Sequence, residues 1–287
     1  MSNIQFASPA TIFKLSRGKG ALTNPLSYFY LECGPVVSMA TYGSRCNTVW
    51  MALESIARGT LKPARCILWI DWTDSYADEK VISRFRDLQS RGLEIKEYDN
   101  KVLGPHRKYY PYVEDLIRGR ILNPLVIADD DVVYPPYWLE ELYRNYEVRP
   151  KVINCWRARQ ILLEGEKFWP YRDWPNCNAT EASYQNLATG TQGVIYPPDF
   201  LCILKDDIGM QHKEFLNCCA KNDDLWLNVQ ALRAGYKTRQ IRNKAAFFPT
   251  IPGTEATGLF TKNVTRNDHY LPLTYLPSDL EKMRENV

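Results

Sequence analysis

The amino-acid sequence predicts one α/β domain with a mostly parallel central sheet flanked by helices. Through the first half of the chain, short apolar runs rich in β-branched residues alternate with longer stretches whose apolar residues recur at helical spacing. That alternation is typical of βαβ units, in which a helix joins two parallel strands. We find no internal repeat and no low-complexity segment. The chain has 287 residues, so one large domain can bury a substantial core.

Each expected element of the first half has a local signal. The run PVVSMATYG is apolar and ends in Gly43, and the helix that follows stops at Gly59. LVIADDD is another apolar run, and its end carries three consecutive aspartates. In chain order we expect a strand at 35–43, a helix at 47–59, a strand at 65–70, a helix at 78–91, a strand at 93–99, a helix at 109–119 and a strand at 125–131.

The pattern loosens after Pro150. There we expect a strand or hairpin pair, an aromatic- and proline-rich loop, a glycine-bearing stretch, a helix closed by Gly235, and a C-terminal tract with little periodicity. These segments are 151–165, 168–180, 187–201, 222–234 and 251–270, in that order. We interpret 1–34 as an irregular lead-in segment and 35–287 as one domain, whose halves are 35–150 and 151–287.

Charge and composition exclude several classes of protein. A net charge of +3 and a pI near 8.3 are too mild to indicate nucleic-acid binding. No run approaches the roughly 20 apolar residues that span a bilayer, and residues 1–20 lack the apolar core of a signal peptide. The eight cysteines form no C-x-x-C pair, which favours free thiols and a cytoplasmic protein. Basic clusters at 14–19 and 233–244 are explained by a solvated face, with attraction to an anionic membrane surface as the alternative.

Asp129, Asp130 and Asp131 form the strongest chemical feature of the sequence. Three adjacent carboxylates at the end of a buried strand repel one another, and burying them unpaired is costly. A hard divalent cation such as Mg²⁺ or Mn²⁺ takes oxygen ligands and often shares them with phosphates. Alternate residues of an extended segment point the same way, so Asp129 and Asp131 can face one site while Asp130 points elsewhere. The alternative is an acidic turn that caps the next helix.

Asn222, Asp223 and Asp224 open the helix expected at 222–234. In that place they can form an N-cap with charges that suit the helix dipole. A carboxylate there can equally be a general base aimed into the strand-end cleft. The two roles are compatible, because Asn222 or Asp223 can cap the helix while Asp224 faces a substrate.

Glycines, a histidine and a group of aromatic residues give weaker signals. Gly190 and Gly193 suggest a backbone that passes close to a ligand, although any turn can need glycine. His269 falls in an expected polar C-terminal loop, where it can bind a metal or a phosphate, although a lone histidine is more often structural. Stacking on a sugar and packing in the core explain the aromatic group equally well. That group is Trp156, Trp169, Tyr171 and Trp174.

Four segments follow one another in an order shared with a known enzyme fold. They are VVSMATYGSR with its helix NTVWMALESIARG, then IADDDVVYPPYWLEEL, then ATGTQGVIYPPDF, and finally NDDLWLNVQALRAGYKTRQI. Together they resemble the nucleotide loop, D-x-D strand end, acceptor-side glycine loop and x-E-D helix of GT-A glycosyltransferases, closest to the inverting family-2-like group. The resemblance spans about 35–270 and implies the Rossmann-like GT-A fold, with 35–150 as the nucleotide-sugar half and 151–287 as the acceptor half.

The resemblance implies a role for each candidate residue. It places Mn²⁺ or Mg²⁺ on Asp131, assisted by Asp129 and by a C-terminal histidine, here His269. Asp224 corresponds to the catalytic base. The residues implied for the nucleotide sugar, expected to be a UDP-sugar, are Thr41, Tyr42, Arg45, Asp71 or Asp74, Lys108, Asp129 and Asp130. Those implied for the acceptor side are Gly190, Gly193, Trp156, Trp174 and Asp223.

The chain also departs from the family pattern. Asp223 replaces the usual glutamate of the x-E-D helix, which shortens that side chain by one methylene. The stretch GPHRKYYPYVEDL is not the usual Asn-rich segment; it brings His106, Arg107 and Lys108 close to the acidic strand in sequence, where they can meet a diphosphate. The Q-x-x-R-W motif of processive synthases is absent, which favours a single transfer.

The expected function is transfer of a sugar from a nucleotide sugar to a hydroxyl of a glycan or lipid-linked acceptor, with inversion of configuration. Analogy with other users of the fold suggests bacterial surface-polysaccharide biosynthesis, in the cytoplasm or peripherally at the inner face of the membrane. A retaining transferase is one rival. A nucleotidyltransferase is another, but TYGSRCN lacks the Gly-rich phosphate loop expected there. A non-catalytic sugar-nucleotide-binding module is the third, and the intact acidic residues argue against it.

Overall fold

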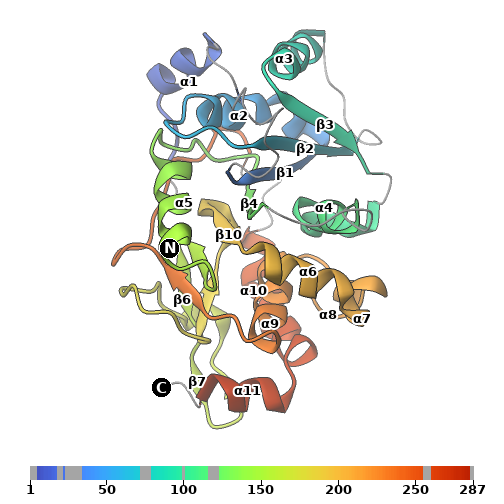
Figure 1. Cartoon of the computed structure of the whole chain (residues 1–287), viewed down its shortest axis with the longest axis vertical. Helices are drawn as coiled ribbons and strands as arrows, with labels where there is room; N and C mark the ends of the chain where they lie inside the picture. Colours follow the sequence, from blue (N-terminus) through green and yellow to red (C-terminus); the bar gives the residue numbers. More distant parts are fainter. Residues whose placement is uncertain are drawn as a thin grey trace.

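The computed structural model describes residues 5–17, 22, 34–71, 79–98, 101–115, 123–254 and 260–284. It confirms the predicted α/β fold. A seven-stranded, mostly parallel sheet forms the centre of the molecule, and helices cover both of its faces (Figure 1).

The central strands of this sheet are short, apolar and buried, as expected where helices cover both faces. Their bounds are β1 (Val36–Tyr42), β2 (Arg65–Asp71), β3 (Leu93–Glu97), β4 (Leu125–Ala128), β5 (Ile153–Cys155), β10 (Val194–Tyr196) and β11 (Thr238–Gln240). They lie in the order β11-β5-β10-β4-β1-β2-β3. Every strand except β10 runs in the same direction, since β10 is antiparallel to β4 and β5 while the other pairs are parallel.

Two small antiparallel pairs extend the second half of the chain. One joins β6 (Ala158–Gln160) to β9 (Asn186–Ala188), and the other joins β7 (Leu163–Glu164) to β8 (Lys167–Phe168). The strand or hairpin pair expected at 151–165 is therefore divided among three sheets: β5 belongs to the main sheet, β6 pairs with β9, and β7 begins the small hairpin.

The helices follow the predicted order in the first half. The α-helices are α1 (Pro9–Ser16), α2 (Val49–Ala57), α3 (Glu79–Ser90), α4 (Tyr110–Asp115), α5 (Trp138–Val148), α6 (Pro198–Asp206), α7 (Ile208–Gln211), α8 (Phe215–Cys218), α9 (Asp223–Arg233), α10 (Phe260–Thr274) and α11 (Pro277–Arg284). Short 3-10 helices are η2 (Gly43–Asn47), η4 (Lys101–Lys108), η6 (Tyr171–Asp173) and η7 (Gly190–Gln192).

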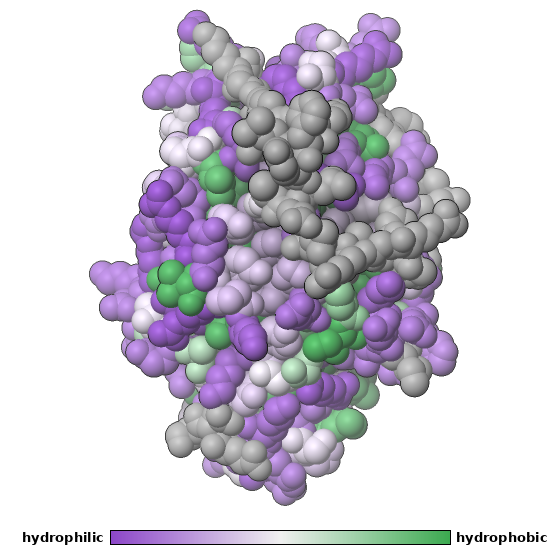
Figure 2. All heavy atoms as spheres, in the orientation of Figure 1, coloured by the Kyte–Doolittle hydropathy of each residue, from purple (hydrophilic) through white to green (hydrophobic). Residues whose placement is uncertain are grey.

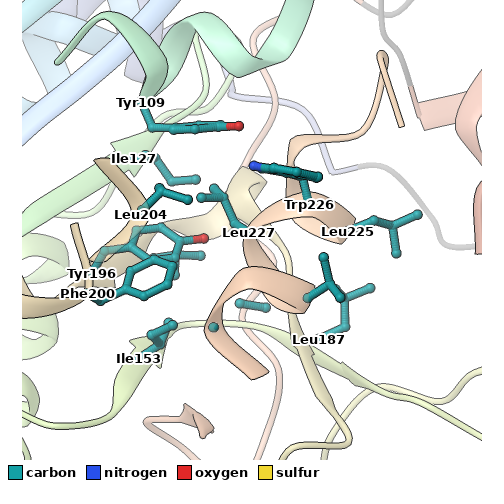
Figure 3. Packing of buried hydrophobic residues seen from close by; sticks show 14 of the residues in the cluster. Tyr109, Ile127, Ile153, Leu187, Tyr196, Phe200, Leu204, Leu225, Trp226 and Leu227 are labelled. Atoms are coloured by element: carbon teal, nitrogen blue, oxygen red, sulfur yellow. The ribbon is translucent and has the colours of Figure 1, made fainter. Parts of the chain in front are cut away.

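Two apolar cores lie on the two faces of the sheet. In β1, Val37 and Met39 enter the core formed with α2 and α3, whereas Val36 enters the core formed with α6 and α9. This division follows from the alternation of side chains along a strand. The second core fixes α9 firmly, because its residues pack against β10 and α6 (Figure 3). The labelled members of that packing include Tyr196, Phe200, Leu204, Leu225, Trp226 and Leu227.

The described part of the lead-in segment is packed on the domain. Ser8 caps α1 by accepting a hydrogen bond from the backbone of Thr11. The backbone N–H of Ala7 donates to the carbonyl of Thr250 at 2.9 Å, and Ala7 and Leu15 are buried in the core that contains α2. The segment predicted to be irregular thus contains a helix and supplies part of that core.

The C-terminal tract is also more regular than predicted. Residues 260–274, expected to lie in a stretch with little periodicity and beyond it, form the helix α10. Asn267, Leu271 and Thr274 are buried along one side of that helix. Their spacing of four and three residues is a helical signal, and the polar Asn and Thr within it concealed the pattern from a search for apolar periodicity.

The surface agrees with the composition. Figure 2 shows a largely hydrophilic face on which apolar residues form small, separate groups. No helix in the described part of the chain is both long and apolar enough to cross a bilayer. The cysteines within the described ranges are all free thiols, and most of them are buried.

Candidate active site

The acidic triplet lies where the parallel strands end. Met39 of β1 is in register with Ala128 of β4, so the segments that follow the two strands emerge side by side. Asp129 comes directly after β4, and Thr41 and Tyr42 are the last residues of β1. In open parallel sheets the carboxyl ends of the strands are the usual place for ligands.

Asp130 ties the two strand ends together. Its carboxylate accepts a 2.7 Å hydrogen bond from the Thr41 hydroxyl and forms an ion pair with Arg45 from η2. Arg45 also pairs with Asp131 at 2.9 Å. Asp130 is buried, and its partners account for the burial of its charge. Thr41 and Arg45, predicted to contact the nucleotide, therefore hold the acidic turn in this structure.

Asp131 lies closer to solvent, with its side chain 19% exposed. Burial and the neighbouring charges of Asp130 and Asp129 raise the pKa of Asp131 to about 7, and Arg45 opposes that rise. The strand predicted to continue through Asp131 ends at Ala128, and Asp130 and Asp131 lie in a turn. The predicted end of the strand at Asp131 is therefore wrong, because the extended backbone stops at Ala128; that Asp129 and Asp131 face one site stays a prediction.

Lys108 joins the triplet to the second acidic group. Its ammonium lies 2.9 Å from Asp129 and 2.8 Å from Asp223, and the lysine is only 7% exposed. Burial acts to raise the pKa of Asp129, but Lys108 outweighs it and the pKa falls below the ordinary value. The lysine expected to meet a diphosphate is therefore engaged by two carboxylates.

The neighbours of Lys108 also face protein groups. Arg107 pairs with Asp71 at the end of β2, at 2.9 Å. His106 is fully buried between the Tyr109 hydroxyl at 2.8 Å and the Cys219 carbonyl at 3.0 Å. Burial lowers the pKa of His106 to about 3, so its ring is neutral and structural.

The start of α9 carries a cap and two carboxylates, as the sequence predicted. Asn222 caps the helix by accepting a 3.1 Å hydrogen bond from the Leu225 backbone. Its side-chain nitrogen donates at 2.7 Å to Asn267 on α10. Asp223 turns inward to Lys108, and Asp224 accepts a 2.9 Å hydrogen bond from the backbone N–H of Gly190.

The surroundings of Asp224 raise the pKa of its carboxylate. Burial and the adjacent charge of Asp223 raise the pKa of Asp224 to about 8, against the effects of Lys108 and the Gly190 N–H. A carboxylate with a pKa near neutrality accepts a proton more readily than an ordinary aspartate. The side chain is partly exposed, whereas Asp223 is buried.

Gly190 and Gly193 are required for different structural reasons. A Cβ built on Gly190 would lie 3.1 Å from Asp224 Oδ1 and 3.2 Å from Ile127, so this glycine allows the backbone to approach the base. Gly193 has φ +104°, and a Cβ there would lie 2.5 Å from the Trp138 ring. Gly190 thus belongs to the site, whereas the need for Gly193 comes from packing on Trp138.

The oxygen donors fit a divalent cation. Among the described residues, only two cations, Arg45 and Lys108, form ion pairs with the five carboxylates of this cluster. The five are Asp129, Asp130, Asp131, Asp223 and Asp224. The excess negative charge and the hard oxygen atoms suit Mg²⁺ or Mn²⁺. Within the described residues, no three His, Cys, Asp or Glu side chains are grouped to hold a metal. Binding of Mg²⁺ or Mn²⁺ at this place therefore stays a prediction.

Other predicted residues are not brought into this cluster. His269 is exposed on α10 instead of lying in a loop, and its role as a metal ligand stays a prediction. Trp156 and Trp174 are buried to 1% and 2% exposure, so packing accounts for them and neither ring offers a face for stacking on an acceptor. Tyr42 is 43% exposed, and Asp74 lies outside the described residues.

Sequence reasoning missed one side chain of the site and one nearby cavity. Tyr134 lies behind the triplet: the Asp129 backbone donates to its hydroxyl at 2.8 Å, and that hydroxyl donates to the Thr191 carbonyl at 3.2 Å. No local pattern distinguished this tyrosine. A cavity of about 530 Å³ opens between the β7–β8 region and the last two helices, and none of the acidic residues above lines it.

Comparison with known proteins gives no family. No family model and no curated protein matches the chain. A crystal structure of S. aureus TarS, residues 1–349, aligns with a TM-score of 0.46 and 11% sequence identity. The alignment covers 72% of this chain and 58% of that chain, less than two thirds of its length. The inferences that follow therefore rest on the geometry of the site.

Proposed function

We propose that the chain is a metal-dependent glycosyltransferase that moves a sugar from a nucleotide sugar, with a UDP-sugar as the first candidate, to a hydroxyl of a glycan or lipid-linked acceptor. One observation carries the proposal. Two carboxylate groups about a hundred residues apart in sequence meet at the carboxyl edge of a parallel sheet, joined by Lys108. One group suits a cation and phosphates, and the other provides a base.

The donor half of the reaction belongs to the strand ends. Asp131, assisted by Asp129, would hold a divalent cation, which supplies charge to stabilise the departing nucleoside diphosphate. Asp130 fixes the turn through Thr41 and Arg45. In this arrangement Asp131 and Asp129 are partly exposed, with 19% and 24% of their side chains accessible, whereas Asp130 is buried.

The acceptor half belongs to α9. Gly190 holds one carboxylate oxygen of Asp224, which leaves the other oxygen to take the proton of an acceptor hydroxyl. As that proton leaves, the hydroxyl oxygen forms a bond to the anomeric carbon of the donor. The bond from that carbon to the diphosphate breaks, and the nucleoside diphosphate departs with the electron pair. An in-line attack of this kind inverts the anomeric configuration.

A nucleotidyltransferase is the second candidate, because it would use the same strand-end carboxylates with a nucleotide. It needs no base at the position of Asp224, and the close approach of Gly190 to that carboxylate favours the glycosyltransferase. A role in bacterial surface-polysaccharide biosynthesis, at the inner face of the membrane, is the biological setting that we propose by analogy.

A thermal-shift and donor-hydrolysis screen tests the proposal. The wild-type protein is measured with UDP-, GDP-, dTDP- and CMP-sugars, with and without Mn²⁺. We expect stabilisation and slow hydrolysis with one nucleotide class, dependent on the metal and lost in Asp131→Asn. Asp87→Asn, at an exposed carboxylate on α3, is the matched control and should behave as wild type. No metal-dependent response to any donor would refute the proposal.

A further inference from the structure

Two arginines lie on the acceptor side of Asp224 and are not used by the mechanism above. Arg157 immediately precedes β6 and Arg159 lies within it. Residues two apart on extended backbone point to the same side, and the intervening Ala158 is buried on the other. Both arginines are half-buried.

Neither arginine has a carboxylate partner within the described residues. Arg157 donates to the Asn176 side chain at 3.2 Å, and its guanidinium lies 4.6 Å from the centroid of the Phe247 ring. Arg159 donates through Nε to the carbonyl of Trp174 at 3.1 Å and through Nη2 to the carbonyls of Arg172, at 3.2 Å, and Trp174, and it lies 4.5 Å over the Tyr171 ring. Arg45 and Arg107, in the other half of the chain, are by contrast each paired with an aspartate.

The main chain places this pair next to the proposed base. The carbonyl of Arg157 accepts a 3.0 Å hydrogen bond from the backbone of Thr189. Thr189 precedes Gly190, whose N–H holds Asp224. Burial lowers the pKa of Arg157; Arg159 adds to that effect, while the charges of Tyr171 and Asp224 oppose it. The backbone of Thr189 and Gly190 thus connects Arg157 to Asp224.

Two neighbouring guanidinium groups repel each other, and partial burial removes water that would screen them. Stacking on aromatic rings holds each group in place. Hydrogen bonds to described residues engage Nε of Arg157, and Nε and Nη2 of Arg159, so both Nη groups of Arg157 and Nη1 of Arg159 are left to meet a ligand. Such forks match phosphate and carboxylate oxygens. An anion bridging the pair would relieve the repulsion and satisfy the free donors.

We propose that Arg157 and Arg159 bind an anionic group of the acceptor, a phosphate or a carboxylate, beside the hydroxyl that Asp224 deprotonates. The acceptor is therefore a molecule that carries a phosphate or a carboxylate close to its reacting hydroxyl. That the anion belongs to an acceptor rests on the proposed function. The anion site itself rests on the geometry of the two arginines.

Inorganic phosphate is the probe. Its binding is measured by isothermal titration calorimetry at constant ionic strength for wild type, Arg157→Gln/Arg159→Gln and Arg172→Gln. Arg172 is the matched control, because it lies in the same region, 71% exposed, with an aspartate neighbour. We expect the affinity to fall at least about tenfold in the double variant, as loss of charge-assisted hydrogen bonds requires, and to stay within about twofold in the control. Equal binding by wild type and the double variant, or no binding by wild type, would overturn the proposal.

A second arm separates the acceptor from the donor. Phosphate is titrated again with saturating Mn²⁺ and UDP. Binding that persists beside UDP supports an acceptor site, whereas displacement by UDP assigns the arginines to the donor diphosphate and overturns the proposal. If the double variant does not fold, Arg157→Lys/Arg159→Lys keeps the charges and tests the fork geometry. Phosphate binding lost in the variant, in a protein with no metal-dependent donor response, would retain the anion site and refute only the glycosyltransferase.

Discussion

The groups Asp129–Asp131 and Asp223–Asp224 reach the same edge of the sheet from opposite halves of the chain, but they are held differently. In the first group each carboxylate contacts a cation, since Lys108 pairs with Asp129 and Arg45 with Asp130 and Asp131. In the second group only Asp223 does so, while Asp224 is held by a neutral backbone N–H.

The difference suggests two roles: carboxylates paired with a cation hold the structure of the site, and Asp224, which has no such partner, is the candidate for proton transfer. A cation partner lowers the pKa of a carboxylate, whereas burial next to another negative charge raises it. The pairing wins only at Asp129, whose pKa falls below the ordinary value; burial raises the pKa of Asp131 to about 7 in spite of Arg45 and that of Asp224, which has no cation partner of this kind, to about 8. In the second half of the chain, Arg157 also has no carboxylate partner among the described residues. An ion pair between Arg157 and Asp224 would have neutralised both charges. Substitutions that exchange these two situations are the sharpest tests of the comparison.

The largest effect is expected for Asp224→Asn. The amide keeps the shape and the hydrogen bond from Gly190 but cannot take a proton, so kcat for transfer should fall about 10²–10⁴-fold. Steady-state kinetics with the donor found in the screen provide the measurement. The KM for the donor should change little, because Asp224 lies on the acceptor side. A variant with near-wild-type kcat would show that another group is the base.

Lys108→Met should produce the next largest effect, and on stability as well as activity. It leaves Asp129 and Asp223 without their shared cation, and breaking a buried pair costs about 3–5 kcal/mol. Urea unfolding at pH 7 measures the change. Lys108→Arg keeps the charge and is the control for its size. A loss below about 1 kcal/mol in the Met variant, the range of exposed pairs, would mean that the link is not structural.

Substitution of Gly190 and of Gly193 by alanine distinguishes a glycine needed beside Asp224 from one needed for packing. Gly193→Ala must displace Trp138 and adopt a strained φ, so we expect a loss of about 1–3 kcal/mol in stability. Gly190→Ala presses on Asp224 and Ile127 at 3.1 and 3.2 Å, so its activity should fall more than its stability. Parallel unfolding and kinetic measurements decide the matter. Equal losses in both properties for both variants would contradict the distinction.

The smallest effect is a shift in pH dependence. If Asp224 is the base, its carboxylate form is the active one; burial with Asp223 raises its pKa to about 8, so activity should rise with pH through that value and level off above it. Asp223→Asn removes a negative neighbour and should move this limb to lower pH by roughly one unit. The pH profile of kcat/KM measures it. A limb that stays in place or moves upward would argue against the assigned cause.

The strands and helices of the first half were predictable because their signals are local. The run LVIA is apolar and short, and the helix of α9 has its cap and closing glycine at the expected places. Asp129–Asp131 and Asp224 were found for the same reason. The turn after Ala128 was not, because three aspartates give no indication of where extended backbone stops.

What joins the site was outside the reach of local patterns. Arg45 and Asp130 are 85 residues apart, and Lys108 and Asp223 are further apart still. A lysine among basic neighbours predicts a phosphate ligand as readily as a buried ion pair, and only the packing of η4 against β1 decides between them. The buried Trp156 and Trp174 show the same limit, since composition does not tell which face of a loop turns inward.

The hydrogen bond between Asn222 and Asn267 links α10 to the start of α9. One atom of the Asn222 amide caps α9 and the other reaches α10, so the end of the chain steadies the turn that aims Asp224. If the proposed function holds, truncations, tags or crosslinks near α10 should slow turnover while the protein still unfolds cooperatively. On the proposed function, a change in α10 would therefore reach the start of α9 through this one hydrogen bond.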